Sequence, residues 1–352
     1  MLFVFFLKMN LSKTLISWYS VNKRDLPWRN TLNPYYIWLS EIILQQTQVK
    51  QGLPYYSAFT AKFPTIYDLA NADESVVLKL WQGLGYYSRA RNLHASAKYI
   101  VFELDGVFPA TYKEIIKLKG VGDYTASAIA SICFNEATAV VDGNVYRGLS
   151  RYYGIKTPIN TGKGFKEFKA IAQDLIDVKN PAMFNQAIME FGARQCKPKN
   201  PNCTICPLNN ECVALRESSI ESLPVKLKTG KVKKKYFNFI VIISKNKKTV
   251  LQQREGKGIW QNLYQFPLIE TVKPCGDITS KLNILQVLSN EKYEVSLYNE
   301  QEIVHKLSHL HLYTKFWIVS TDGDIPEGVL FKDIRDYPVP ILIGDFIESF
   351  NF

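Results

Sequence analysis

The sequence has no apolar run long enough to cross a membrane. The N-terminal run, residues 1–7, is much shorter than the roughly 20 apolar residues of a membrane-spanning helix. It also lacks a preceding basic flank and a small-residue cleavage site, so it is a poor secretory signal. We therefore expect a cytoplasmic protein with no membrane partner, whose ordered chain begins near Leu11 and for which Met9 is an alternative start.

Cysteine is scarce and unevenly placed. Only six cysteines occur; four fall between Cys196 and Cys212, while Cys133 and Cys275 stand alone. This argues against a disulfide-stabilised secreted scaffold and favours metal binding in a reducing compartment. The sequence also lacks internal repeats and low-complexity tracts. A length of 352 residues with 47% apolar residues then favours two packed domains.

Acidic residues are in the minority. The sequence has 32 Asp and Glu against 43 Lys and Arg, a net charge of +11. Such a balance favours a polyanionic partner, although a merely basic soluble protein has the same composition.

The apolar pattern changes from helical to strand-like along the chain. Helical periodicity predicts helices at residues 11–19, 36–49, 67–70, 74–81, 89–103, 112–118, 125–134, 145–153, 164–178 and 181–191. Beyond a lysine-rich stretch, the pattern predicts strands at 237–244, 249–254, 263–268 and 309–320, with helices at 280–288 and 341–350. We predict a helical domain at 9–222, a basic linker at 223–235 and a small α+β domain at 236–352.

The segment around Gly120 and Gly122 is a candidate phosphate-binding turn. The two glycines lie between two predicted helices. Glycine lets backbone N–H groups approach a ligand without a Cβ in the way. The helix beginning near Thr125 points free N–H groups and its positive dipole end at the same spot. This arrangement suits a phosphate, although a plain turn between helices has the same pattern.

Two carboxylates stand in apolar surroundings. Glu41 lies inside an apolar helical run, and Asp142 follows an apolar run at an Asp-Gly turn. Burial either raises the pKa of a carboxyl group or requires a partner for it. Glu41 is therefore a candidate acid, the alternative being the exposed stripe of an amphipathic helix. Asp142 is a candidate catalytic group or an ordinary helix cap.

The loop at residues 83–91 combines glycines, adjacent tyrosines and arginines. Such a loop can insert an aromatic ring into a base stack and hold phosphates. The alternative is a tyrosine-rich junction between helices.

The clustered cysteines follow the spacing Cys196-x6-Cys203-x2-Cys206-x5-Cys212. Four thiolates in one loop can hold zinc or an iron–sulfur cluster. A structural zinc site more often pairs two close knuckles. The uneven spacing resembles the [4Fe–4S] loop of the endonuclease III and adenine glycosylase families, which implies such a cluster, with zinc as the alternative. Nearby basic residues make the loop a candidate DNA-contacting surface.

Together these motifs resemble the adenine DNA glycosylase (MutY) family of helix-hairpin-helix base-excision enzymes, over nearly the whole chain. The matching segments are residues 26–29, 38–41, 44–49, 84–87, 120–122, 141–145, 184–187 and the cysteine loop 196–212. The resemblance implies a multidomain fold: an all-α glycosylase domain in two helical lobes with an iron–sulfur loop, plus a small α+β Nudix-like domain for lesion recognition. No Gly-x5-Glu-x7-Arg-Glu box is present, so we do not expect that domain to hydrolyse nucleotides.

The implied reaction is hydrolysis of the N-glycosidic bond of adenine opposite 8-oxoguanine or guanine in duplex DNA. The implied enzyme is a monofunctional monomer of the bacterial cytoplasm and nucleoid. Adenine leaves readily only when a ring nitrogen is protonated, which is a task for Glu41. The carboxylate of Asp142 can stabilise the oxocarbenium-like sugar that remains. The family adds Tyr124 and Asn144 as active-site partners.

The resemblance also assigns substrate contacts and cluster ligands by position. The walls of the adenine pocket are Trp28, Arg29, Gln186 and Glu190; the residues near the mispair are Gln46 and Tyr86; the hairpin is Gly120 and Gly122; the lesion contact is Ser308; and the [4Fe–4S] ligands are Cys196, Cys203, Cys206 and Cys212.

Two positions depart from the family pattern. Lys119 stands where the family usually has proline in the hairpin, and it adds a charge near the phosphate. Residues 305–309 stand where the family often has Phe-Ser-His, and Leu307 has no aromatic face for stacking.

Two other functions share parts of this pattern. An endonuclease III-like glycosylase/lyase acting on oxidised pyrimidines has the hairpin, the Asp and the cluster. It would need lysine where Tyr124 stands, and it lacks this C-terminal domain. A non-catalytic DNA-damage sensor has no need of both Glu41 and Asp142.

Overall fold

A computed structural model describes residues 2–228, 230, 232–284, 292–350 and 352. The chain forms two compact units. One consists of Met1–Asn71 with Asn92–Lys228, and the other of Ala72–Arg91 with Thr229–Phe352. Within the described ranges, no helix has the length and apolar character needed to span a membrane.

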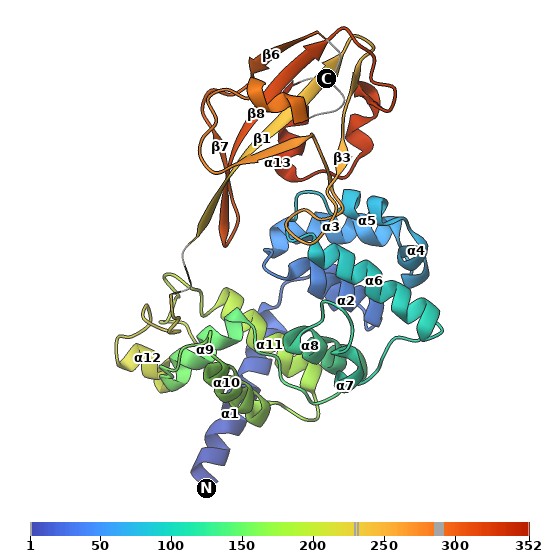
Figure 1. The fold of residues 1–352 in the computed structure, drawn as a ribbon. Helices are drawn as coiled ribbons and strands as arrows, with labels where there is room; N and C mark the ends of the chain where they lie inside the picture. The colour runs from blue at the N-terminus through green and yellow to red at the C-terminus, as the bar shows by residue number, and fades with distance from the viewer. Residues whose placement is uncertain (1, 229, 231, 285–291, 351) are drawn as a thin grey trace. The chain divides into compact units, whose positions relative to one another are not determined.

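The first unit is helical, as predicted (Figure 1). Its helices are α1 (Leu2–Asn22), α2 (Pro34–Leu44), α3 (Val49–Lys62), α4 (Ile66–Asn71), α6 (Ser88–Glu103), α7 (Tyr112–Ile115), α8 (Asp123–Phe134), α9 (Gly143–Tyr153), α10 (Gly162–Leu175), α11 (Pro181–Arg194) and α12 (Val213–Arg216), with 3-10 turns η1 (Pro27–Arg29) and η2 (Asn209–Glu211). The first residues of α6 are counted with the second unit. Helix α1 begins well before the predicted position near Leu11.

The single helix predicted at 36–49 is wrong. Helix α2 ends at Leu44, and a separate helix α3, which the sequence analysis missed, begins at Val49. Gln46 has a φ of 54°, and a residue in this left-handed region cannot continue a right-handed helix. Pro54 lies inside α3 and concealed it, because proline usually ends a helix.

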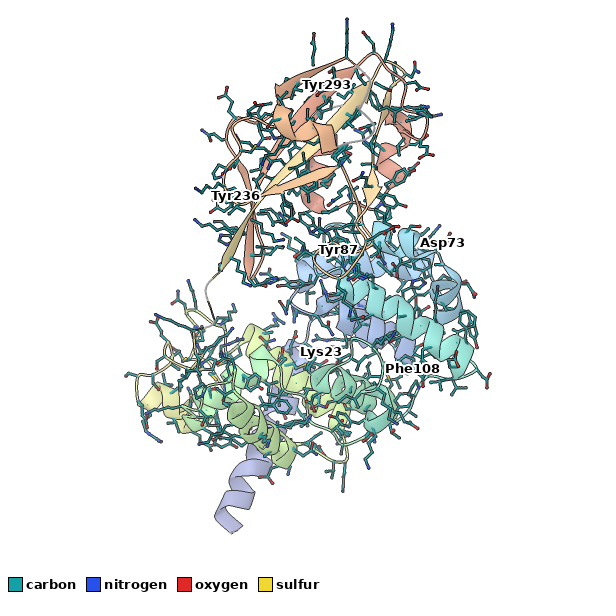
Figure 2. All side chains as sticks on the ribbon, in the orientation of Figure 1. Lys23, Asp73, Tyr87, Phe108, Tyr236 and Tyr293 are labelled. Atoms are coloured by element: carbon teal, nitrogen blue, oxygen red, sulfur yellow. The ribbon has the colours of Figure 1, made fainter. Side chains whose placement is uncertain are left out.

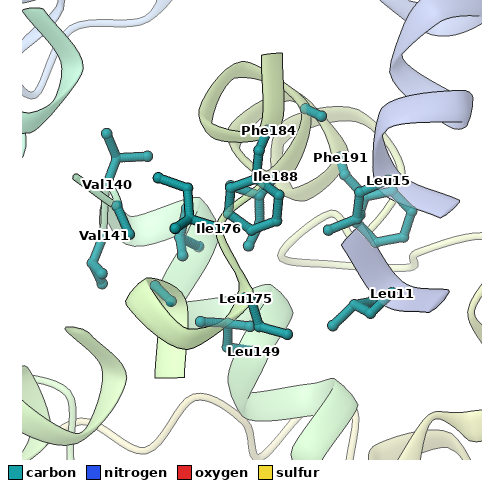
Figure 3. Packing of buried hydrophobic residues seen from close by; sticks show 14 of the residues in the cluster. Leu11, Leu15, Val140, Val141, Leu149, Leu175, Ile176, Phe184, Ile188 and Phe191 are labelled. Carbon is teal, nitrogen blue, oxygen red and sulfur yellow. The ribbon is translucent and has the colours of Figure 1, made fainter. Parts of the chain in front are cut away.

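One hydrophobic core joins α1 to helices from far along the chain (Figure 3). Its members include Leu11 and Leu15 of α1, Val140 and Val141 before α9, and Phe184, Ile188 and Phe191 of α11. Full burial of each large apolar side chain contributes about 1.5–3 kcal/mol. The core therefore holds residues 139–141 firmly, and these residues lead directly to Asp142.

The second unit is built on a mixed β-sheet with strand order β5-β1-β8-β6, in which β7 also pairs with β8. Strand β1 (Lys233–Ser244) runs parallel to β8 (Leu310–Thr321), while β5 (Leu268–Thr271), β6 (Tyr293–Leu297) and β7 (Ile303–Lys306) are antiparallel to their neighbours. Short ladders join β2 (Lys248–Thr249) to β9 (Val329–Leu330) and β3 (Gln252–Gln253) to β4 (Tyr264–Gln265). The unit also contains helices α5 (Glu74–Leu80) and α13 (Ile341–Phe350) and 3-10 segments η3 (Thr279–Ile284) and η5 (Phe331–Asp336).

The predicted α+β character of this unit is confirmed, but its details differ. The strand predicted at 249–254 is divided between β2 and β3, and that at 263–268 between β4 and β5. Strands β6, β7 and β9 were not predicted. In place of the helix predicted at 280–288 there is a 3-10 segment ending at Ile284, and residues 285–288 lie outside the described residues.

Two features bear on the predicted domain limits. Strand β1 begins at Lys233, inside the stretch predicted as a linker. Residues 72–91, inside the predicted helical domain, group with the C-terminal residues. Hydrogen bonds connect these two parts of the second unit: Asn262 Nδ2 donates to Glu74 Oε1 at 2.6 Å, and Arg91 donates to the Gln261 carbonyl at 2.8 Å.

Candidate active site

Glu41 is buried in the second half of α2, and the residue is only 9% exposed. Burial raises the pKa of Glu41 to about 7. A hydrogen bond from Tyr124 and the charge of Arg29 oppose the rise, and the charge of Asp142 adds to it. A carboxyl group with this pKa is about half protonated at neutral pH, so Glu41 can donate a proton under physiological conditions.

Asp142 caps the N-terminus of α9 and is held by three hydrogen bonds. Its Oδ1 accepts from the backbone N–H groups of Asn144 at 2.9 Å and Val145 at 2.8 Å, and its Oδ2 accepts from Asn144 Nδ2 at 2.7 Å. Burial raises the pKa of Asp142, while these three hydrogen bonds and the charge of Arg147 oppose the rise. The predicted cap is present, and the same contacts fix the orientation of the carboxylate.

The segment before Asp142 is fixed by a buried amide on α11. Asn185 Oδ1 accepts from the Val140 N–H at 3.1 Å, and Asn185 Nδ2 donates to the Thr138 carbonyl at 2.8 Å and to Ser131 Oγ at 2.9 Å. An extended segment needs partners for its buried backbone groups. Asn185 supplies these partners. The position of Asp142 is therefore fixed by contacts of the residues before it, with Asn185, and by its own contacts with the residues after it.

Tyr124 follows the hairpin glycines, in the first turn of α8. Its hydroxyl lies 3.2 Å from Met189 Sδ and also hydrogen-bonds to Glu41. A carboxylate is a far better acceptor than a thioether sulfur, so we assign the hydroxyl proton to Glu41. Burial and the nearby charges of Glu41 and Asp142 raise the pKa of Tyr124 well above its usual value, and the hydroxyl therefore stays protonated.

Glu190 on α11 is paired with two arginines. Arg24 donates to its two carboxylate oxygens at 2.8 and 2.6 Å, and Arg29 donates to Oε2 at 2.7 Å. Burial acts to raise the pKa of Glu190, but these hydrogen bonds outweigh it and lower the pKa to about 2. Glu190 is therefore fully ionised at the pH values around 7 at which Glu41 gains or loses its proton. Such a separation of pKa values marks Glu41 as the acid of the site.

These side chains line one cavity of about 190 Å³ within the first unit. The predicted residues in its lining are Trp28, Arg29, Glu41, Tyr124, Asp142, Asn144, Gln186 and Glu190. Trp28 provides an aromatic wall and is held edge-on against Tyr56 with ring centroids 5.0 Å apart. The cavity thus combines an acid, a second carboxylate and an aromatic surface, which suits a single planar base.

Three predicted contacts of the first unit lie outside this lining. Gln46 is exposed in the turn after α2. Gly120 and Gly122 are exposed in the hairpin before α8. Gly120 has a φ of 79°, and a Cβ there would lie 2.8 Å from Asn92 Cβ, so the turn requires glycine.

Two predicted contacts belong to the second unit. Tyr86 is 48% exposed and has a φ of 46°. Ser308 is exposed in the turn between β7 and β8, with Oγ 3.4 Å from His309 Nδ1. Both side chains are available to a partner, which a DNA-contacting role requires.

Arg147, which was not predicted as a site residue, joins Asn144 to the cysteine loop. Its NH2 donates to Asn144 Oδ1 at 2.8 Å and to the Gly192 carbonyl at 2.6 Å, and its Nε donates to the Cys196 carbonyl at 2.7 Å. Holding Asn144 Oδ1 turns the amide nitrogen towards Asp142. The i, i+3 spacing of Asn144 and Arg147 on one helix was the available signal.

Arg24 and Met189 were also missed. Arg24 lies in the connection after α1, where an arginine has no pattern that separates it from a solvated surface charge. Met189 on α11 resembles an ordinary apolar helix position. Only the pairing of α11 with these distant segments shows that both line the cavity.

The four predicted cysteine ligands line a second small cavity, of about 30 Å³. Arg151 borders it and donates to Cys196 Sγ at 3.4 Å and to the Lys197 carbonyl at 2.7 Å. Among the residues the structure describes, no group of three or more His, Cys, Asp or Glu side chains forms a ready metal-ion site. Four thiols around one cavity do match the ligand set of a [4Fe–4S] cluster, which is larger than a single ion.

Family comparisons identify both parts of the chain. Residues 39–173 match the HhH-GPD superfamily base excision DNA repair protein, and residues 238–349 match the NUDIX domain. The chain is 37% identical to an adenine DNA glycosylase of Buchnera aphidicola subsp. Baizongia pistaciae (strain Bp), with 87% of this chain and 85% of that protein covered. It is 33% identical to an adenine DNA glycosylase of Rattus norvegicus, with 92% and 73% covered.

Solved structures agree on the helical fold. A thermostable thymine-DNA glycosylase matches with a TM-score of 0.56 and 28% identity, over 60% of this chain and 97% of that one. An endonuclease III in a non-covalent complex with DNA matches with a TM-score of 0.52 and 20% identity, over 59% and 95%. The predicted helix-hairpin-helix fold and the Nudix-like domain are confirmed.

Proposed function

The chain belongs to the adenine DNA glycosylase family, and we propose that it excises adenine paired with 8-oxoguanine or guanine from duplex DNA. The protein is a monofunctional base-excision-repair enzyme that hydrolyses an N-glycosidic bond. The observation that carries the proposed mechanism is that Glu41 and Asp142 line one cavity. Its monomeric state and its location in the bacterial cytoplasm, at the nucleoid, stay predictions.

The target base has to leave the duplex before it can enter the cavity. Flipping costs a few kcal/mol, and less at a mispair than at a matched pair. In the cavity, Trp28 offers an aromatic face, while Arg29 and Glu190 offer polar groups. Because Arg24 also holds Glu190, these groups are fixed before the base arrives.

Glu41 then supplies the proton that makes adenine a leaving group. The protonated carboxyl donates to a ring nitrogen, the bond between base and sugar breaks, and adenine departs with the proton. The hydrogen bond from Tyr124 keeps the Glu41 carboxyl in a fixed orientation. Water adds to the sugar and loses a proton to the Glu41 carboxylate, which completes the hydrolysis and restores the acid.

Asp142 stabilises the positive charge that develops on the sugar. Its carboxylate is held by Asn144 and Val145 and needs no rearrangement as the charge appears. A lyase step would need an amine that forms a Schiff base. Tyr124 cannot provide one, which agrees with a monofunctional enzyme.

The test is an excision assay on duplexes with adenine opposite 8-oxoguanine, guanine or thymine, followed by alkaline cleavage. We expect cleavage at adenine, fastest opposite 8-oxoguanine, and little covalent trapping by borohydride. Excision of oxidised pyrimidines with efficient trapping would favour the glycosylase/lyase alternative. Mispair binding without excision would favour the damage sensor.

We also propose that Cys196, Cys203, Cys206 and Cys212 hold a [4Fe–4S] cluster. The four thiols line one cavity, and an HhH-GPD family match accompanies their spacing. Bound there, the cluster would brace the loop. Arg147 and Arg151 of α9 donate hydrogen bonds to backbone carbonyls of this loop, and Arg151 also donates to Cys196 Sγ. These contacts hold the loop against α9.

Purified protein should therefore be brown and contain about four iron atoms per chain, as the cluster type requires. Cys203→Ala should lose iron and fold poorly, whereas Cys275→Ala, in the second unit, should keep its iron. Iron content and visible absorption measure both variants. A colourless, active preparation with one zinc per chain would contradict the cluster.

Lesion preference should depend on Ser308 in the β7–β8 turn. Guanine and 8-oxoguanine differ at the C8 oxygen and the N7 proton, so a polar group at that edge is needed. One neutral hydrogen bond contributes about 0.5–1.5 kcal/mol. Ser308→Ala should therefore lower the preference for 8-oxoguanine over guanine only several-fold, and Leu307, which has no aromatic face, should contribute packing alone.

A chain ending at Lys228 should lose far more of this preference, since it lacks the whole C-terminal segment. The measurement is the ratio of excision efficiencies on the two duplexes, with Ser349→Ala as a matched serine control. A folded truncated protein with an unchanged ratio would place lesion recognition within residues 1–228.

A further inference from the structure

The loop that presents Tyr86 has an internal framework. Trp81 Nε1 donates to the Gly85 carbonyl at 3.1 Å, and Arg89 NH2 donates to the carbonyls of Leu84 at 3.2 Å and Gly85 at 3.3 Å. Arg89 is only 8% exposed, and its guanidinium lies 5.1 Å from the Trp81 ring centroid and 5.8 Å from that of Tyr86. The exposed Tyr86 ring therefore rests on a buried cation.

C-terminal residues hold the same loop on both sides of Tyr86. The hydroxyl of Tyr87, a residue labelled in Figure 2, accepts from the Gly83 N–H at 3.3 Å and donates to the Val339 carbonyl at 3.4 Å. The Val339 N–H donates to Gln82 Oε1 at 3.4 Å. One short segment before α13 thus contacts residues that precede and follow Gly85.

A second C-terminal segment holds the end of the loop. Arg91 donates to the Gln261 carbonyl at 2.8 Å, and the neighbouring Asn262 Nδ2 donates to Glu74 Oε1 at 2.6 Å. Trp260 and Asn262 have φ values of 60° and 65°. Non-glycine residues keep such a conformation where surrounding contacts fix it. This turn is therefore a rigid support for Arg91.

We propose that Tyr87 and Arg91 are positioning residues that fix the Tyr86 loop to these two C-terminal segments and, through Tyr86, set the preference for 8-oxoguanine over guanine. The inference rests on the proposed function, in which Tyr86 lies near the mispair. A ring that enters a base stack discriminates between opposite bases only if its backbone holds it in one place. The hydrogen bonds from Tyr87 and Arg91 supply that restraint.

The test uses full-length protein with Tyr87→Phe, Arg91→Met and the conservative Arg91→Lys. Arg335→Met is the matched control, because Arg335 pairs with the exposed Glu348 in the same unit. Amide hydrogen exchange of residues 83–89 reports the loop directly. Fluorescence of 2-aminopurine placed beside 8-oxoguanine reports insertion of a ring into the stack, and the ratio of excision efficiencies reports the preference.

We expect Arg91→Met to speed exchange in the loop about tenfold, the scale of one lost hydrogen bond. The fluorescence change on binding should shrink, and the excision ratio should fall several-fold. Tyr87→Phe should change these three measurements in the same direction. Arg91→Lys should keep them close to the wild-type values, and Arg335→Met should match wild type.

Unchanged loop exchange in both Tyr87→Phe and Arg91→Met overturns the proposal, as does faster exchange with an unchanged excision ratio. Tyr87→Phe removes a single hydroxyl, so it serves as the test if Arg91→Met does not fold. Tyr86→Ala distinguishes a failure of this proposal from a failure of the proposed function on which it rests. A wild-type ratio in Tyr86→Ala refutes the role of Tyr86 at the mispair, whereas loop exchange still reports whether Tyr87 and Arg91 hold the loop.

Discussion

Glu41→Gln should lower single-turnover excision of adenine by about 10²–10⁴-fold, the usual contribution of general acid catalysis. Glutamine keeps the shape and the hydrogen-bonding capacity of the side chain but has no proton to transfer. Binding of the mispair should stay within a few-fold of wild type, because the duplex contacts are unchanged. Single-turnover kinetics and a gel-shift titration on the same duplex separate the two effects.

The matched control is Glu103→Gln, which changes an exposed glutamate on α6 of the same unit. It should leave both excision and binding near wild type. Near-normal turnover in Glu41→Gln would remove Glu41 from the mechanism.

The pH profile gives an independent reading of the same acid. Burial raises the pKa of Glu41 to about 7, so the protonated form dominates below that pH and is lost as the pH rises through it. Wild-type excision should therefore fall about tenfold per pH unit well above pH 7. Glu41→Gln should lack this limb, and a wild-type rate that is flat between pH 6 and 9 would argue against Glu41 as the acid.

Local patterns made the chemical groups predictable. Glu41 stood out because a charged residue interrupts an apolar helical run, and α2 indeed buries it. Asp142 stood out because an apolar run ends in Asp-Gly, and the structure uses it as a helix cap. Both signals depend on neighbours within a few residues, which is the range over which helix and cap propensities act.

Long-range pairing could not be predicted in the same way. Arg24 meets Glu190 only because α1 and α11 share a core, and nothing near Arg24 in the sequence distinguishes it. Residues 72–91 were assigned to the helical domain, yet they group with the C-terminal residues, to which hydrogen bonds with Gln261 and Val339 connect them. Strands β6 and β7 were not predicted because each is short and forms by pairing with β8.

Asp142→Asn should lower excision by about 10²–10³-fold, the scale on which one preorganised electrostatic partner of a developing charge contributes. The amide oxygen of asparagine can still accept from the N–H groups of Asn144 and Val145, so the start of α9 keeps its cap. What disappears is the negative charge beside the sugar. The amide nitrogen also faces Asn144 Nδ2, a donor that previously met a carboxylate oxygen.

Asparagine is as good a helix cap as aspartate, so the melting temperature of Asp142→Asn should stay close to wild type. Thr161→Ala provides the opposite control. Thr161 caps α10 by accepting from the Gly164 N–H at 3.0 Å, outside the lining of the catalytic cavity. Its loss should cost about 1 kcal/mol of stability and leave excision at moderate temperature unchanged.

The two variants, Asp142→Asn and Thr161→Ala, therefore separate the effect of the carboxylate charge from the effect of helix capping. Thermal melting and single-turnover kinetics should show Asp142→Asn folded and slow, and Thr161→Ala less stable and active. The double variant Glu41→Gln/Asp142→Asn should be less impaired than the product of the two single effects, because the acid and the carboxylate act on one transition state. Excision within tenfold of wild type in folded Asp142→Asn would show that the sugar needs no carboxylate at this position, and the departing base and its proton from Glu41 would then account for the catalysis.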